Sequence, residues 1–259
     1  MRRDLAAATA TLVRGRAAPE AVVLAYHDVV ARGATGYTVT ARALRGHVRL
    51  VRRLGLRLVG VRELAERAAT GAPTAGLAAL AFDDGLVGVH RHALDVLAEE
   101  DAPATVFAVS RVWGAEPAWW PGSARTMDRT EMLEARAAGL TIAAHTRTHP
   151  SLPACDDAAL AAEVAGCRAD LEDLTGEPVR TLAYPQGHHD ARVRAAARDA
   201  GYDAAFTFLN GRIRPGDDPL RLPRLTMTAA HTPLRLAYHL ARPAASWPDH
   251  QVDAVAAVR

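Results

Sequence analysis

The stretch AALAFDDGL, residues 78–86, decides how this chain folds and where its chemistry lies. A short apolar run of this kind is typical of a buried strand. The run ends in two adjacent carboxylates, Asp83 and Asp84, followed by Gly85, which allows a tight turn. Two neighbouring acids repel each other unless a cation lies between them. The stretch therefore predicts a buried strand with a functional group at its carboxyl end.

Similar apolar runs alternate with helix-period segments along the whole chain. The predicted strands are 21–26, 56–59, 77–82, 104–109, 140–144, 181–184, 204–208 and 224–227, and the predicted helices are 41–54, 61–69, 88–100, 129–138, 156–174, 190–200 and 233–242. Asp156 and Asp190 are expected to cap two of these helices. This alternation predicts an α/β fold with a mostly parallel sheet covered on both faces. We expect one domain over residues 1–259, with a core at about 20–242, folded as a distorted (β/α) barrel of about seven parallel strands.

The composition excludes some classes of function. The 259 residues carry a formal net charge of +2, so nothing indicates a nucleic-acid or anionic-membrane partner. Cys155 and Cys167 have no metal-ligand spacing, and we expect two free thiols rather than a disulfide.

The ends of the chain carry weak signals. Residues 1–16 are Arg-rich and weakly hydrophobic, a poor match to a signal peptide, and residues after about 243 are expected to be loosely held. No segment has the ~20 apolar residues of a membrane span. We expect no integral membrane segment and a cytoplasmic location, with a secreted or cell-surface location as the alternative if a leader has been removed.

Titratable residues follow several predicted strands, at the edge where parallel α/β folds place their sites. His27 follows the first strand, the two aspartates follow the third, and HTRTHP (145–150) follows the fifth. The spacing of His145 and His149 lets both imidazoles face one ion. With a strand-end aspartate they form a 2-His-1-carboxylate set, which suits Zn²⁺ or another divalent metal. The second aspartate can then act as a general base.

These motifs resemble the polysaccharide deacetylase family (carbohydrate esterase family 4, the NodB homology domain). AFDDG is similar to its [TS]FDDG signature, with Ala81 in place of Thr or Ser, and HTRTHP is similar to its H-[ST]-x-x-H motif. RTLAYPQG (180–187) resembles the third motif, and ATVFAV (104–109) resembles another strand of the family. The resemblance extends over about residues 21–227.

The resemblance implies a role for each matching residue. Asp83 would be the catalytic base, and Asp84, His145 and His149 the metal ligands. The backbone N–H of Tyr184 would help to hold the oxyanion, with Pro185 shaping the same wall and Arg180 orienting the base. Separately, Trp119 and Trp120 in WGAEPAWWPGS (113–123) are either loop-packing residues or platforms for a sugar ring, and we assign Trp120 to substrate binding.

The general acid is expected at the amino-terminal end of the chain. The usual Leu-x-x-His motif has no good copy after the third motif, where His231 is the nearest histidine. VVLAYHDV (22–29) is a good copy, ending in His27, and resembles the permuted branch of poly-N-acetylglucosamine deacetylases. The first and last strands of a closed barrel are neighbours, so His27 can occupy the same place. We therefore favour His27 over His231. The Asp-containing fourth motif has no counterpart here.

The resemblance implies a hydrolase that removes N-acetyl groups from an amino-sugar carbohydrate, using Zn²⁺ or else Co²⁺, Ni²⁺ or Mn²⁺. The partner would be an N-acetylated glycan or a small amino sugar. One alternative keeps this site but makes the chain a deformylase or an amidohydrolase of a lipid-linked sugar or small natural product. Another is a carbohydrate-binding protein without activity. The sequence leaves the glycan and the oligomeric state open.

Overall fold

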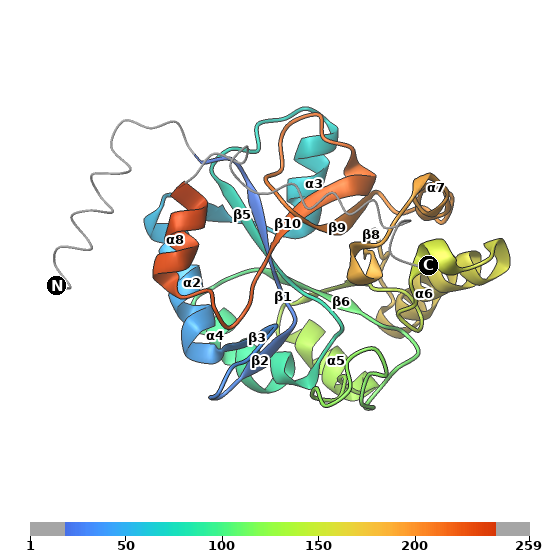
Figure 1. The fold of residues 1–259 in the computed structure, drawn as a ribbon, viewed down its shortest axis with the longest axis horizontal. Coiled ribbons are helices and arrows are strands. Elements are labelled where there is room, and N and C mark those ends of the chain that lie inside the picture. Colours follow the sequence, from blue (N-terminus) through green and yellow to red (C-terminus); the bar gives the residue numbers. More distant parts are fainter. Residues whose placement is uncertain (1–18, 242–259) are drawn as a thin grey trace, which may run out of the picture.

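The computed structural model describes residues 19–241, and their centre is a closed ring of seven parallel strands (Figure 1). The order around the ring is β1-β10-β9-β8-β7-β6-β5, and β5 pairs with β1 to close it. The strands of the ring are β1 (Val22–Tyr26), β5 (Leu77–Phe82), β6 (Ala104–Ala108), β7 (Thr141–Ala144), β8 (Thr181–Ala183), β9 (Ala204–Asn210) and β10 (Leu222–Thr226). The predicted barrel of about seven parallel strands is confirmed. The signal-peptide prediction and the predicted tail after 243 lie outside the described residues.

The helices lie around the ring (Figure 1). They are α2 (Ala41–Arg53), α3 (Val61–Ala69), α4 (Leu94–Glu99), α5 (Arg129–Ala137), α6 (Asp157–Thr175), α7 (Ala191–Asp199) and α8 (Pro233–Ala241). Asp156 and Asp190 cap α6 and α7 as predicted, by accepting from the N–H groups of Ala159 and Val193. None of the helices within residues 19–241 is long and apolar enough to cross a membrane.

Three details differ from the sequence-based prediction. The segment 56–59 forms only the short strand β4 (Arg57–Leu58), which joins β5 outside the closed ring. A small parallel pair, β2 (Asp28–Val30) and β3 (Thr38–Thr40), was not predicted, because three residues are too few for a periodicity signal. The helix predicted at 88–100 begins as one π-helical turn, Val89–Ala93, before α4.

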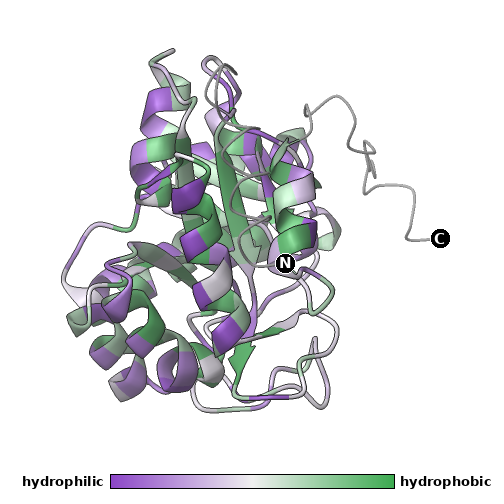
Figure 2. Cartoon of the chain, turned by 90° about the vertical axis from the view of Figure 1, so that its left-hand side faces the viewer, coloured by the Kyte–Doolittle hydropathy of each residue, from purple (hydrophilic) through white to green (hydrophobic). Residues whose placement is uncertain are grey.

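The strands alternate between two packed layers, as side chains of a strand must. Val22, Leu24 and Tyr26 of β1 face the helices, while Ala21 and Val23 face the barrel interior. The hydropathy colouring agrees, with hydrophobic strands inside and mixed helices outside (Figure 2). The alternation also positions the site. In β1, β5 and β7 it continues to the residue directly after the strand, and that residue faces inward. The next inward positions are His27, Asp83 and His145.

Candidate active site

Five polar side chains from three strand ends line one pocket at the carboxyl edge of the barrel. They are His27, Asp83, Asp84, His145 and His149, around a cavity of about 250 Å³. Tyr26 is in register with Phe82, and the N–H of Asp83 donates to the carbonyl of Tyr26 at 2.9 Å. The permuted first strand therefore brings its histidine beside the two aspartates, as predicted.

Asp84, His145 and His149 form a compact group. Their possible ligand atoms all lie within 4.8 Å of one another. Oδ1 of Asp84 lies 3.5 Å from Nε2 of His145 and 3.4 Å from Nε2 of His149. Nδ1 of His145 lies 2.7 Å from the carbonyl of Ala183. Donation of the Nδ1 proton to that carbonyl leaves Nε2 with a free lone pair, the usual arrangement of a metal-ligating imidazole.

The backbone at the site adopts conformations that most residues avoid. Among the described residues, four of the five non-glycine positions with positive φ are here: Asp84 (67°), Thr146 (67°), His149 (64°) and Gln186 (57°). Gly85 has a φ of 65°, as the expected tight turn requires. Strained backbone of this kind persists where the surrounding structure holds it, and functional sites are its usual location.

The two aspartates have opposite electrostatic environments. Burial alone would raise the pKa of Asp83, but Arg224 outweighs it and the net pKa lies well below its usual range. Arg224 on β10 is fully buried and donates from its two terminal nitrogens to Oδ1 and Oδ2 of Asp83, at 2.7 and 2.8 Å. Burial, and then the charge of Asp83, raise the pKa of Asp84 to about 8.

Arg224 therefore compensates the charge of Asp83, while no arginine pairs with Asp84 within the described chain. A cation beside Asp84 would remove that imbalance. The donor set of two imidazole nitrogens and one carboxylate oxygen also fits a divalent first-row ion. Burial lowers the pKa of His149 to about 2, so this imidazole is neutral and able to coordinate. These residues fit a metal ion.

Arg180 does not occupy the predicted position beside the base. It precedes β8, at the amino end of the barrel, where its carbonyl accepts from the N–H of Asp203 at 2.8 Å. Asp83, the predicted base, is paired instead with Arg224, 141 residues away along the chain. The available signal was an arginine inside an otherwise apolar strand, because a buried guanidinium needs a charged partner.

The prediction for Tyr184 is also wrong in its detail. Its N–H donates to the carbonyl of Phe206 at 3.0 Å, and its hydroxyl donates to the carbonyl of Leu220 at 3.0 Å, so neither faces the pocket. Pro185 is buried and begins the short turn that follows. The next residue, Gln186, lines the pocket, and its N–H donates to no acceptor in residues 19–241. The chain thus offers the N–H of Gln186 in place of that of Tyr184.

Aromatic rings surround His27. Tyr37, Trp120 and Phe208 lie with ring centroids 5.0, 5.9 and 5.9 Å from the imidazole. Burial lowers the pKa of His27 to about 4, although the charge of Asp83 acts in the opposite direction. Nδ1 of His27 is buried and has no hydrogen-bond partner among the described residues. Within residues 19–241, therefore, no carboxylate pairs with Nδ1 of His27 in place of the missing fourth motif.

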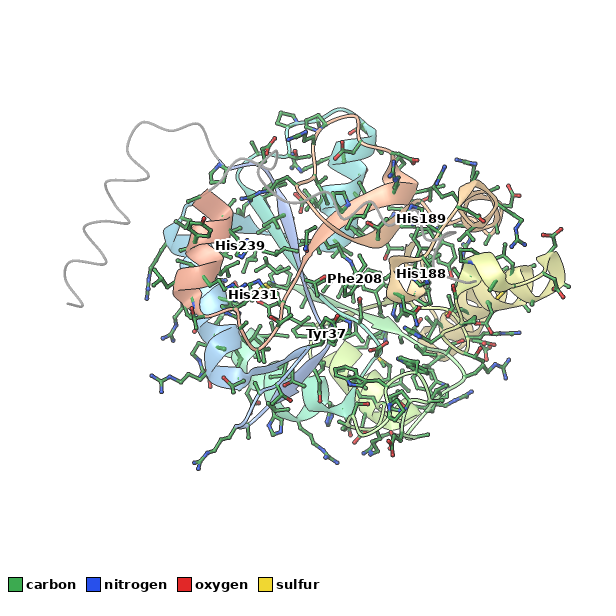
Figure 3. All side chains as sticks on the ribbon, viewed as in Figure 1. Tyr37, His188, His189, Phe208, His231 and His239 are labelled. Atoms are coloured by element: carbon green, nitrogen blue, oxygen red, sulfur yellow. The ribbon has the colours of Figure 1, made fainter. Side chains whose placement is uncertain are left out.

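His231 does not line this pocket. Its Nδ1 accepts from the N–H of Thr228 at 3.0 Å, and its ring lies 5.4 Å from that of His239. In Figure 3, His239 lies on α8 and His231 lies close to the same helix, whereas Tyr37 and Phe208 lie nearer the middle of the barrel. His188 and His189 lie on the other side, near the end of β8 (Figure 3), where they contact Ser151 and Tyr184.

Comparison with known proteins gives the family. The family model described as "Polysaccharide deacetylase" matches residues 70–205, just over half of the chain. The chain belongs to the polysaccharide deacetylase family.

Individual relatives agree with this. A chitooligosaccharide deacetylase of Sinorhizobium fredii is 31% identical over 159 residues, which cover 60% of this chain and 66% of that protein. The chain spans just under two thirds of that relative. IcaB from Ammonifex degensii has a TM-score of 0.74 and 25% identity, over 86% of this chain and 98% of that structure. The Streptococcus pyogenes deacetylase PplD has a TM-score of 0.74 and 19% identity, over 87% of this chain and all of that one, which shows a shared fold.

Proposed function

We propose that this protein is a metal-dependent deacetylase that hydrolyses the N-acetyl group of an N-acetylated amino-sugar carbohydrate. The observation that carries the proposal is the buried Asp84–His145–His149 group beside an aspartate paired with arginine. The family supports deacetylation. The Sinorhizobium fredii relative, named as a chitooligosaccharide deacetylase, favours an amino-sugar substrate.

Asp84, His145 and His149 would hold the ion, and we propose Zn²⁺ because it accepts this mixed nitrogen and oxygen set with a position left open. Such an ion supplies Lewis acidity, which lowers the pKa of water and polarises the acyl carbonyl. The residues of the chain then divide the remaining tasks between them.

Asp83 would accept the proton of the attacking water. Arg224 keeps this carboxylate ionised and fixes the plane of both oxygens, and each oxygen retains a lone pair for the incoming proton. The N–H of Gln186 would donate to the oxygen of the acyl group as negative charge develops there. One such donor contributes about 3–4 kcal/mol in acyl-transfer enzymes.

His27 would give a proton to the departing amine. Burial lowers the pKa of His27 to about 4, so its imidazole is mostly neutral near pH 7, and the proton that Asp83 takes from the attacking water would pass to His27 and from there to the amine nitrogen. The aromatic rings of Tyr37, Trp120 and Phe208 would exclude water from this half of the pocket and contact the apolar face of the sugar ring.

The proposal is tested by acetate release from chitooligosaccharides, poly-N-acetylglucosamine and N-acetylglucosamine. Asp83→Asn should abolish turnover and leave metal content unchanged, whereas Asp84→Asn should lower metal content. Metal loss in Asp83→Asn alone would show that the two roles are reversed. Release of formate rather than acetate, from formylated sugars, would replace the proposed reaction with deformylation.

A further inference from the structure

Trp119 is a pocket residue whose contacts the proposed reaction does not use. It belongs to the irregular segment 113–123, and its indole Nε1–H donates to Oδ1 of Asp84 at 3.1 Å. Its ring lies flat on the imidazole of His149, with centroids 4.4 Å apart and planes 17° apart. One side chain thus contacts two of the three candidate metal ligands.

The hydrogen bond from Trp119 reaches the central atom of the group. Oδ1 of Asp84 is also the atom that lies 3.5 Å from Nε2 of His145 and 3.4 Å from Nε2 of His149. A donor fixed on that oxygen restricts rotation of the carboxylate. Partners of this kind, which orient ligands without touching the ion, control metal affinity in many sites.

The stacking contact replaces an orienting hydrogen bond that His149 lacks. His145 is held by the carbonyl of Ala183 at its Nδ1, whereas Nδ1 of His149 is buried with no hydrogen-bond partner among the described residues. No described polar group therefore holds His149 at its Nδ1, and the flat face of Trp119 limits rotation of the ring from one side.

Residues 125–127, which follow the segment 113–123 that carries Trp119, are hydrogen-bonded to the loop that carries Asp84. The N–H of Met127 donates to the carbonyl of Gly85 at 2.8 Å, and the N–H of Val87 donates to the carbonyl of Arg125 at 2.9 Å. An antiparallel bridge joins Leu86 and Thr126 between these two bonds. The N–H of Thr126 also donates to the carbonyl of Ala115 at 2.9 Å, so backbone hydrogen bonds connect the segment that carries the indole to the loop that carries the aspartate.

We propose that Trp119 is a positioning residue of the metal centre, which holds Asp84 by its N–H and His149 by its ring. This inference rests on the proposed function, because it assumes that these ligands bind a divalent ion. It assigns the metal centre a fourth side chain, outside the three motifs.

Trp120 provides a matched control. It lies next to Trp119 on the same segment, but its ring contacts are His27 at 5.9 Å and Tyr37 at 6.1 Å, both edge-on at 87°. The two adjacent indoles thus face different halves of the pocket. A change at Trp119 should alter metal binding, and the same change at Trp120 should not.

The experiment measures the dissociation constant for Zn²⁺ by competition with a chromogenic chelator. Trp119→Phe keeps an aromatic ring and loses the N–H, and we expect it to weaken Zn²⁺ binding about 10-fold. Trp119→Ala loses both contacts and should weaken binding by up to about 100-fold. Trp120→Phe should stay within about twofold of wild type. Urea unfolding of each variant in excess chelator shows whether the apo fold is intact; if Trp119→Ala is unfolded, Trp119→Phe carries the test.

Tryptophan emission gives a second readout. Addition of Zn²⁺ should change the emission of wild type and of Trp120→Phe, and this change should vanish in Trp119→Phe. Equal Zn²⁺ affinity in wild type and Trp119→Phe would overturn the inference, as would an equal loss in Trp120→Phe. Wild type that binds no divalent ion would instead refute the metal site of the proposed function.

Discussion

Removal of the guanidinium of Arg224 is predicted to destabilise the protein by leaving Asp83 charged and unpaired in the barrel. The two side chains are 0% and 2% exposed, and they are joined by two short hydrogen bonds, at 2.7 and 2.8 Å. Loss of one member of such a buried pair costs about 3–5 kcal/mol. For a domain of this size, that corresponds to a fall in Tm of about 6–20 °C. Arg224→Met, which keeps most of the side-chain volume, isolates this effect.

The pH dependence of the stability lost in Arg224→Met shows whether the loss comes from the unpaired charge of Asp83 or from altered packing. In wild type, the pKa of Asp83 is lowered, so its stabilising contribution is present above the unfolded value of about 3.9 and is lost as the pH falls through the folded pKa. In Arg224→Met, burial raises this pKa instead, and the carboxyl destabilises the fold above about pH 3.9. The difference in free energy of unfolding between wild type and Arg224→Met should therefore be largest near pH 7 and become smaller toward pH 4.

Urea unfolding followed by circular dichroism, in excess chelator at pH 7 and pH 4.5, measures this difference. The double variant Arg224→Met/Asp83→Asn should recover part of the stability at pH 7, because the unpaired charge is gone. A loss below about 1 kcal/mol in Arg224→Met, or a double variant whose losses simply add, would refute the account of this pair.

Three further outcomes are expected. Gly88→Ala should lower the free energy of unfolding by about 1–3 kcal/mol in the same urea assay, because the added Cβ would overlap a carboxylate oxygen of Asp28. A variant as stable as wild type would contradict this close approach of Gly88 to Asp28. The pKa of Cys167 is raised to about 12 by burial, so mass spectrometry should find it unmodified by iodoacetamide until urea unfolds the protein, and rapid native labelling would contradict this. His27→Ala should lower kcat for acetate release about 100-fold or more, while His231→Ala should change kcat less than about threefold. The reverse order of effects would mean that His231, and not His27, is the general acid.

The barrel was predictable because its signals are local. The apolar runs that form the seven strands of the ring, and the aspartates that cap α6 and α7, can be read from a few neighbouring residues. The alternation along β5 even places Asp83 inward, since Ala79 and Ala81 face the same interior. Strands of two or three residues, such as β2 and β3, give too little pattern to be recognised.

The parts of the site that were missed depend on contacts between distant segments. Arg224 reaches Asp83 across 141 residues, and no spacing rule connects the two. Tyr184 is the aromatic residue of the third motif, but its N–H still pairs with the carbonyl of Phe206 and cannot donate to a ligand. The N–H of Gln186 can donate to a ligand, because the chain turns away from the sheet there with a positive φ. Tyr37 and Phe208 come from segments without any motif.

The central claim, that Asp84, His145 and His149 hold a catalytic metal ion, is tested most directly by metal content measured together with acetate release. The purified protein should contain about one divalent ion per chain, lose acetate release when that ion is removed by a chelator, and regain it when Zn²⁺ is restored. His149→Ala should fail to regain both metal and activity. Acetate release that is unchanged by complete metal removal would contradict the account.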